Sequence, residues 1–505
     1  MKKNILRVVC IVLLLSAILP MAISCKKNTN QDINDKSQAT DDVVDATDDS
    51  TADSSFETDE NGFIKDTINR KLEDTEITIL MDESSIVDVM PEREQIENNT
   101  IAENSYKRKL SLEKDLGCKI KIIKAKGEWG GMNDYILAAE KAGYDSAGVD
   151  ILCSFSLVPS QLVSKGMLTN MNNLEYPQLE MPWWPKSIEN WQHSGALYFV
   201  ANNSSNRVIR AQEVIFANNQ IVIDNGLEPL EQTVIKGEWT VELMTTYAKQ
   251  VNTDLNAEKP IYGLAVDDQG RMDQFLYGAD IKMTELSNDG SVSLALVSPS
   301  NILKVESLIA KIGEIASTPG FYIDKNDSAK LIQNRRAMFI AGYMNMLITT
   351  DSKNESGYIP LPTPKYDEDQ EDYITTPHNS YDMWSIPTFC INKEDAALVI
   401  EAIASTDYRT LAPVFYENML KARYSVGAEG AAIFDIIRNA TNLDFGRVTA
   451  ASVDILETHF RTCFYRAGAT TYINDYASKM NVEEQARYKA KLDTLLFEFD
   501  LYKDQ

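Results

Sequence analysis

Two Gly-Glu-Trp triplets, at residues 127–129 and 237–239, each place a carboxylate beside an aromatic ring. Two carboxylates on opposite sides of a sugar can hydrolyse a glycosidic bond, one as the acid and the other as the nucleophile or base. Glu238, however, comes two residues before Thr240, which is suited to cap the start of a helix, and Trp239 can pack on that helix's first turns. The position of Glu238 needs no catalysis to explain it, so an enzyme acting on glycosides is the alternative and not the leading hypothesis.

Other sets of residues that support catalysis or metal binding are missing from the sequence. The histidines, His193, His378 and His459, are far apart, and neither a Gly-x-Ser-x-Gly motif nor a glycine-rich phosphate loop occurs. The acidic run at 367–372 lacks the glycine that a calcium-binding turn of the EF-hand type requires. We therefore predict no catalytic residues, no cofactor and no metal site.

The first 24 residues have the pattern of an export signal. Lys2 and Lys3 precede an apolar stretch that is too short to cross a bilayer as a helix and that ends at Cys25. The segment Ala22-Ile23-Ser24-Cys25 resembles a bacterial lipobox, whose cysteine is acylated and becomes the new N-terminus. A plain secretory leader with a chance cysteine is the alternative. We predict a signal peptide at 1–24, a lipid anchor on Cys25, and a location on the outer face of the cell membrane.

Residues 25–60 are predicted to be a disordered acidic tether. Residues 26–60 hold eleven acidic side chains against three lysines, and large apolar residues are scarce. Such a segment cannot bury enough apolar surface to fold, and its charges repel one another. The whole chain carries a net charge of −26, which argues against nucleic acid as a partner. The cysteines at 118 and 153 adjoin strand-like runs and are expected to be buried thiols.

Beyond the tether, strand-like and helix-like patterns alternate without hairpin turns. This order predicts a parallel α/β sheet, in which ligands meet the loops at the carboxyl ends of the strands. Those loops are expected at Asp82-Glu83, at 127–129 and at 154–156. The elements expected are strands at 76–82, 118–125 and 148–156 and helices at 97–116 and 133–142.

Several longer segments, taken in order, resemble extracellular solute-binding proteins of family 1, the lipid-anchored receptor subunits of ABC importers. The segments are "DILCSFSLVPSQLVSKGMLTNMNNL", "MPWWPKSIENWQHSGALYFV", "VIFANNQIV", "GEWTVELMTTYAKQV", "NRRAMFIAGY", "GYIPLPTPKYDEDQEDYITT" and "WSIP". The resemblance implies the type II periplasmic-binding fold, an α/β fold of two lobes with a ligand cleft between them. By analogy the chain crosses near Ala201, Lys330 and Pro387. Lobe 1 is then 61–201 plus 330–387, and lobe 2 is 202–329 plus 388–505.

The resemblance also implies a function, which is to capture a small solute, above all a carbohydrate or oligosaccharide, and to pass it to the permease subunits of the importer. Two further alternatives stand beside it: a surface-anchored enzyme acting on glycosides, and a sensing or adhesion lipoprotein that serves no transporter. The membrane is a further expected partner, through the lipid anchor on Cys25. The protein is expected to be a monomer.

A sugar presents apolar C–H faces to aromatic rings and hydroxyl groups to amides and carboxylates. Aromatic, amide and acidic residues in loops at the lobe interface are therefore the candidate ligand contacts. The candidate residues are Glu83, Trp129, Tyr198, Asn202, Asn203, Tyr277, Tyr343, Asn379, Tyr381 and Trp384. The adjacent Trp183 and Trp184 are bracketed by prolines and are expected to pack structurally instead.

Overall fold

The first sheet combines three strands from residues 75–155 with one strand from a later part of the chain. The computed structural model describes residues 56–505 apart from 146, 267, 324–327, 352–354, 425–426, 467–468 and 471. The strand order is β11–β3–β1–β2, and β1 pairs in parallel with both β2 and β3. The strands are β1 (Thr75–Asp82), β2 (Cys118–Ala125), β3 (Ile151–Phe155) and β11 (Asp382–Ser385). The predicted parallel arrangement is confirmed, and β11 adds an antiparallel edge.

Helices α3 (Thr100–Leu116) and α4 (Met132–Tyr144) connect the parallel strands and contact them. The side chain of Asn99 accepts two backbone N–H groups at the start of α3. Gly117 ends α3 with a φ of 66°, a left-handed conformation that favours glycine. The helices predicted at 97–116 and 133–142 are thus confirmed, with small shifts at their ends.

The second sheet has the order β10–β4–β9–β5–β8. Strand β5 is parallel to β8 and β9, whereas β4 is antiparallel to both β9 and β10. Its strands are β4 (Glu213–Asn218), β5 (Tyr262–Val266), β8 (Phe321–Ile323), β9 (Ala337–Tyr343) and β10 (Tyr358–Leu361). Almost every residue of these strands is buried, as expected of a sheet that is covered on both faces.

Helices α9 (Val241–Lys249) and α11 (Pro299–Ala316) pack against each other beside the second sheet. Thr240 caps α9, because its hydroxyl oxygen accepts the N–H of Leu243 at 3.2 Å. Trp239, just before this cap, is fully buried. The prediction that Thr240 caps a helix start is therefore confirmed. The indole of Trp239 donates to the carbonyl of Pro362 at 2.9 Å and packs against Phe339, so its packing on the first turns of α9 stays a prediction.

The remaining elements surround these two sheets. The other helices are α2 (Ile86–Val89), α5 (Pro159–Val163), α6 (Asn206–Ala211), α7 (Asn219–Asp224), α8 (Glu231–Ile235), α10 (Asp273–Gly278), α12 (Ser328–Gln333), α13 (Met344–Thr350), α14 (Lys393–Thr406), α15 (Ala422–Tyr424), α16 (Gly427–Asn439), α17 (Phe445–Val448), α18 (Thr458–Arg461), α19 (Tyr476–Lys479) and α20 (Val482–Leu501). Short 3-10 turns are η1 (Arg93–Gln95), η2 (Met171–Asn173), η3 (Lys186–Trp191) and η4 (Gln269–Met272), and π-helical turns are η5 (Asp407–Leu411) and η6 (Val414–Lys421). Two small hairpins pair β6 (Thr284–Leu286) with β7 (Val292–Leu294) and β12 (Tyr465–Arg466) with β13 (Ala469–Thr470).

The membership of the sheets differs from the division of the chain expected at Lys330. Residues 330–387 were expected in the first lobe, yet β9 and β10 lie in the second sheet and only β11 of this range joins the first. Helix α14, which was expected in the second lobe, packs against α3 beside the first sheet. The chain therefore returns to the first sheet only at β11, because β9 pairs with both β4 and β5 in the second sheet.

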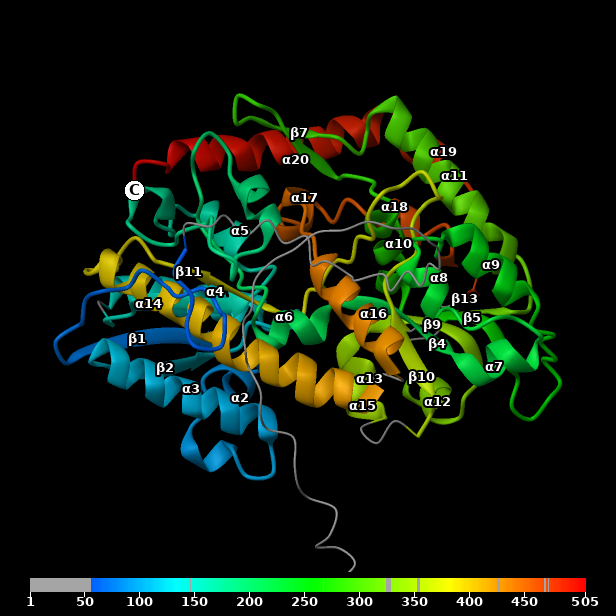
Figure 1. The fold of residues 1–505 in the computed structure, drawn as a ribbon. Helices are drawn as coiled ribbons and strands as arrows, with labels where there is room; N and C mark the ends of the chain where they lie inside the picture. Colours follow the sequence, from blue (N-terminus) through cyan, green and yellow to red (C-terminus); the bar gives the residue numbers. More distant parts are fainter. Residues whose placement is uncertain are drawn as a thin grey trace, which may run out of the picture. The chain divides into compact units, whose positions relative to one another are not determined.

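Helix α6 is the first connection from one sheet to the other. It ends at Ala211, directly before β4, and it contacts α2 on the side of the first sheet and α13 on the side of the second (Figure 1). The hydroxyl of Ser205 caps its start by accepting the N–H of Arg207 at 3.2 Å. The crossing predicted near Ala201 thus falls at this short helix.

Residues 56–60, which were predicted to belong to the tether, are instead part of a folded turn. In this turn, Thr58 forms a β-bridge with Ile64. Phe63, in the same turn, packs edge-on against Tyr408 with 5.6 Å between the ring centroids. The predicted signal peptide, Cys25 and the rest of the tether lie outside the described residues.

The adjacent tryptophans pack structurally, as predicted. The indole N–H groups of Trp183 and Trp184 donate to the two oxygens of the buried Glu401 carboxylate at 2.8 and 3.2 Å. Cys118 and Cys153 are buried free thiols, which confirms the expectation for these two residues.

Candidate functional site

A pocket of about 440 Å³ is lined by residues from both sheets. Its volume lies within the range of small-molecule sites, about 300–1,000 Å³. The first sheet contributes Ser84 after β1, Glu128 and Trp129 after β2, and Phe155 at the end of β3. The loops at the carboxyl ends of the parallel strands therefore line a pocket, where such sheets hold their ligands.

The remaining walls come from the crossing helix, the second sheet and the chain that leads back to the first sheet. These walls comprise Arg207, Arg210 and Ala211 of α6, Tyr343 at the end of β9, Asn345 in α13, and His378, Asn379 and Ser380 before β11. A ligand in this pocket would contact elements of both sheets and the helix that joins them.

The loop after β2 carries Trp129 at the edge of the pocket. Gly127 is buried, and a Cβ atom at this position would overlap the Asp82 carboxylate and come within 3.1 Å of the Tyr135 ring. At Gly130, in contrast, nothing lies within 4 Å of an added Cβ. Position 127 therefore has no room for a side chain beside Asp82, while the Trp129 side chain is 60% exposed and can meet a ligand.

Tyr343 is the aromatic ring on the opposite wall, and two side chains hold it in place. The Arg271 guanidinium lies over the ring, 5.0 Å from its centroid, and the His378 ring packs beside it at 5.1 Å. Arg271 donates in turn to Glu213 at 2.6 Å, and Ser380 is 2.8 Å from Nδ1 of His378. Burial, together with the positive charge of Arg271, lowers the pKa of His378 well below its ordinary value, so this imidazole is neutral at pH 7.

Arg210 connects the two sides of the pocket. Its Nη1 donates to Asp88 of α2 at 2.7 Å, and its Nε donates to Asn345 of α13 at 2.9 Å. Arg207, one turn earlier, lies 3.5 Å from Asp382 and 3.6 Å from Asp88, which is too far for strong hydrogen bonds. The pocket therefore contains one arginine that bridges the two sides and one whose donors are incompletely used.

Three of the predicted ligand-contact residues, Trp129, Tyr343 and Asn379, line this pocket together. Asn379 presents a buried side-chain oxygen that has no hydrogen-bond partner within the described protein. Glu83 is exposed beside Ser84 but does not line the pocket, and neither does the half-buried Asn203.

Other predicted contacts lie in the core, where protein groups satisfy their polar atoms. The Tyr198 hydroxyl donates to the carbonyl of Phe499 at 2.7 Å, and the Asn202 amide donates to Asp407 at 2.8 Å. Trp384 is 4% exposed within β11. These side chains do not reach the pocket, because the strands and the chain before α6 direct them into packed protein.

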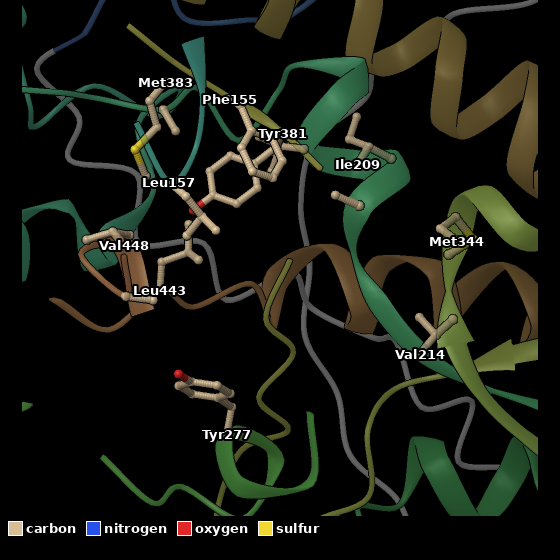
Figure 2. Packing of buried hydrophobic residues seen from close by; sticks show 14 of the residues in the cluster. Phe155, Leu157, Ile209, Val214, Tyr277, Met344, Tyr381, Met383, Leu443 and Val448 are labelled. Atoms are coloured by element: carbon tan, nitrogen blue, oxygen red, sulfur yellow. The ribbon is translucent and has the colours of Figure 1, made fainter. Parts of the chain in front are cut away.

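Tyr381 and Tyr277 are also buried, at separate places. Tyr381 is 1% exposed, and Figure 2 shows its ring beside Phe155 and close to Leu157 in the core. Tyr277 lies apart from them in Figure 2, lines a different cavity of about 160 Å³, and donates its hydroxyl to Glu457 at 2.6 Å. Neither residue lies beside the rings of Trp129 and Tyr343 in the larger pocket.

The arginines of α6 are the site residues that sequence reasoning missed. Ser205 followed by "NRVIRA" is a helix start in which Arg207 and Arg210 are three residues apart and so share one face. That spacing, directly before a buried strand, was the signal available. The candidate contacts predicted for a sugar were aromatic, amide and acidic side chains, and these two arginines belong to none of those types.

The two carboxylates considered for catalysis do not form a pair. Glu128 lines the pocket, but Glu238 is exposed and lies outside the pocket lining. Among the described residues, no group of three or more His, Cys, Asp and Glu side chains is arranged to hold a metal ion. None of the helices in the described part of the chain is both long enough and apolar enough to cross a membrane.

Comparison with known proteins gives similarity in structure only. No protein-family model and no curated protein sequence matches the chain. Among solved structures, the galacto-N-biose/lacto-N-biose I-binding protein of an ABC transporter from Bifidobacterium longum has a TM-score of 0.57 at 11% identity, covering 85% of this chain and 98% of that one. The cyclic alpha-maltosyl-1,6-maltose binding protein from Arthrobacter globiformis has a TM-score of 0.54 at 11% identity, covering 86% and 100%. A cyclo/maltodextrin-binding protein in complex with maltotetraose has a TM-score of 0.52 at 11% identity, covering 85% and 98%.

These similarities define the class of fold. The chain has the two-lobe α/β fold of periplasmic sugar-binding proteins, built on two sheets rich in parallel strands. The fold class predicted from the sequence is thereby confirmed.

Proposed function

We propose that this protein is an extracellular receptor that binds a carbohydrate or oligosaccharide in the pocket between its two sheets. The observation that carries the proposal is the position of Trp129 and Tyr343, two aromatic rings supplied by different sheets to one pocket that also contains amide and guanidinium groups. Rings of this kind cover the C–H faces of a sugar, while polar groups hold its hydroxyls. The similar structures include proteins described as binding lacto-N-biose and maltotetraose, which supports this class of ligand.

The same proposal includes delivery of the bound sugar to the permease of an ABC importer. A ligand that contacts both lobes stabilises the closed arrangement to the extent that it binds this arrangement more tightly than the open one. The galacto-N-biose/lacto-N-biose I-binding protein belongs to an ABC transporter, which supports this role. We further propose that acylation of Cys25 holds a monomeric protein on the outer face of the bacterial membrane and that the acidic residues after Cys25 act as a tether.

The test is a thermal-shift screen of the purified full-length chain against monosaccharides and oligosaccharides, with peptides and polyamines for comparison. We expect at least one glycan to raise the melting temperature and to be recovered unchanged after incubation. A glycan that is cleaved would identify an enzyme instead. Stabilisation by peptides alone would overturn the ligand class.

The transport and anchoring parts of the proposal need separate experiments. Deletion of the gene should abolish uptake of the radiolabelled glycan found in the screen; unimpaired uptake, despite binding, would favour a sensing or adhesion protein. Labelling of cells with a fatty-acid analogue should mark the wild-type chain and not Cys25→Ala. Equal labelling of both would refute an anchor on Cys25.

A further inference from the structure

Arg207 has hydrogen-bond donors that the protein does not use. Its side chain is 15% exposed, and it lines the pocket. Its Nε is buried and has no hydrogen-bond partner within the described protein, since the nearest Asp382 oxygen lies 3.5 Å away. Its Nη1 lies 3.6 Å from Asp88. The exposed part of the guanidinium makes no hydrogen bond within the described protein and can donate to a ligand oxygen in the pocket.

The carboxylates around Arg207 balance its charge and that of Arg210. Asp82, Asp88 and Asp382 are largely buried, and none of them lines the pocket. Ser84 donates to Asp82 at 2.9 Å, and Ser85 donates to Asp382, but Oδ2 of each carboxylate has no hydrogen-bond partner within the described residues. Burial raises the pKa of both Asp82 and Asp382 from its ordinary value, although Arg207 partly counteracts the shift.

Within the described protein, no excess positive charge faces the pocket from the other side. Arg271, behind Tyr343, is paired with Glu213 at 2.6 Å, and His378 is neutral. Glu128, in the loop after β2, is an exposed carboxylate on the pocket lining. A carboxylate on a ligand would therefore meet arginines whose charge is already compensated, together with one uncompensated acid.

We propose that this pocket selects uncharged carbohydrates and discriminates against sugar acids, with Arg207 donating to a sugar hydroxyl and Asn379 accepting from one. The inference rests on the function proposed above and names its ligand class more narrowly. A hydroxyl group both donates and accepts, so it can accept from the exposed part of the Arg207 guanidinium and donate to the unpartnered Asn379 oxygen. A carboxylate can only accept, so it cannot donate to the Asn379 oxygen.

The experiment is calorimetric titration of the protein with matched neutral and acidic disaccharides, such as cellobiose with cellobiuronic acid and galactobiose with digalacturonic acid. Any glycan found in the screen is titrated as well. At low salt the neutral member of each pair that binds should do so at least about tenfold more tightly than the acidic member. Glu128→Gln and Asp382→Asn each remove one negative charge and should narrow that ratio severalfold. Glu128 is exposed, so its variant keeps the test valid if Asp382→Asn fails to fold.

Tighter binding of the acidic member by the wild type would overturn the inference and leave the receptor function intact. If neither Glu128→Gln nor Asp382→Asn changes the ratio of the neutral to the acidic affinity, the inference is likewise overturned and the receptor function stays intact. Binding of no glycan at all would contradict the proposed function and this inference together.

Discussion

Replacement of Trp129 by alanine should weaken glycan binding without destabilising the protein. A tryptophan side chain can bury up to about 250 Å², of which the exposed 60% here is roughly 150 Å². A sugar stacked on one face would cover about half of that area, and burial of ~75 Å² is worth about 2 kcal/mol at ~25 cal/mol per Å². The dissociation constant should therefore rise roughly 25-fold.

The measurement is calorimetric titration of wild type and Trp129→Ala with a glycan identified in the screen, together with thermal unfolding of both proteins without ligand. Because Trp129 is exposed, the unfolding free energy should change by no more than about 0.5 kcal/mol. Tyr144→Ala is the matched control, since this aromatic side chain is 86% exposed and lies outside the pocket lining. Unchanged affinity in a folded Trp129→Ala protein would refute the assignment of this ring as a binding surface.

Further predictions concern the supports of the pocket and the core. Gly127→Ala should lower the unfolding free energy by about 1–3 kcal/mol and weaken glycan binding, because its Cβ would overlap a buried carboxylate, whereas Gly130→Ala should do neither; urea denaturation and titration of both variants test this. Arg271→Met should cost about 3–5 kcal/mol in urea denaturation, because it leaves Glu213 buried and unpaired, and the additional change Glu213→Leu should recover most of the loss if unpaired charge is the cause. Burial raises the pKa of Glu401 from 4.5 to about 7, so the folded protein retains a proton that the unfolded chain releases, and stability should fall by up to about 1.4 kcal/mol per pH unit as the pH rises through this interval. Glu401→Gln should lose this slope in urea denaturation between pH 5 and pH 7; a slope equal to that of the wild type would contradict the reasoning.

The sequence predicted the three parallel strands of the first sheet and the helices between them well, because each of these elements is specified locally. Apolar runs of strand length alternate with a helix that has a capping asparagine at one end and a glycine at the other, and such signals do not depend on distant residues. The membership of β9 was not predictable in the same way. The local sequence of a buried strand does not indicate which sheet the strand joins. The place of β9 is determined by its pairing with β4 and β5, which are more than seventy residues away in the chain.

The candidate site was predictable where a residue follows a parallel strand and much less so elsewhere. Trp129 could be placed because the carboxyl end of β2 and the glycines around it mark an exposed loop. Tyr198, Tyr381 and Trp384 are equally aromatic, but their burial depends on which neighbours cover them, and this is decided by tertiary packing. Residue type alone does not distinguish a ring that contacts a ligand from a ring in the core.

Helix α6 shows why residue type alone does not identify the arginines of the pocket. A helix of six residues is too short to be stable alone, so its stability must come from its surroundings. Those surroundings are the Ser205 cap and the contacts of Arg210 with Asp88 on one side and Asn345 on the other. The same guanidinium group thus holds the connection between the sheets and lines the pocket. Because one residue serves both purposes, a structural explanation for Arg210 does not argue against a role in binding.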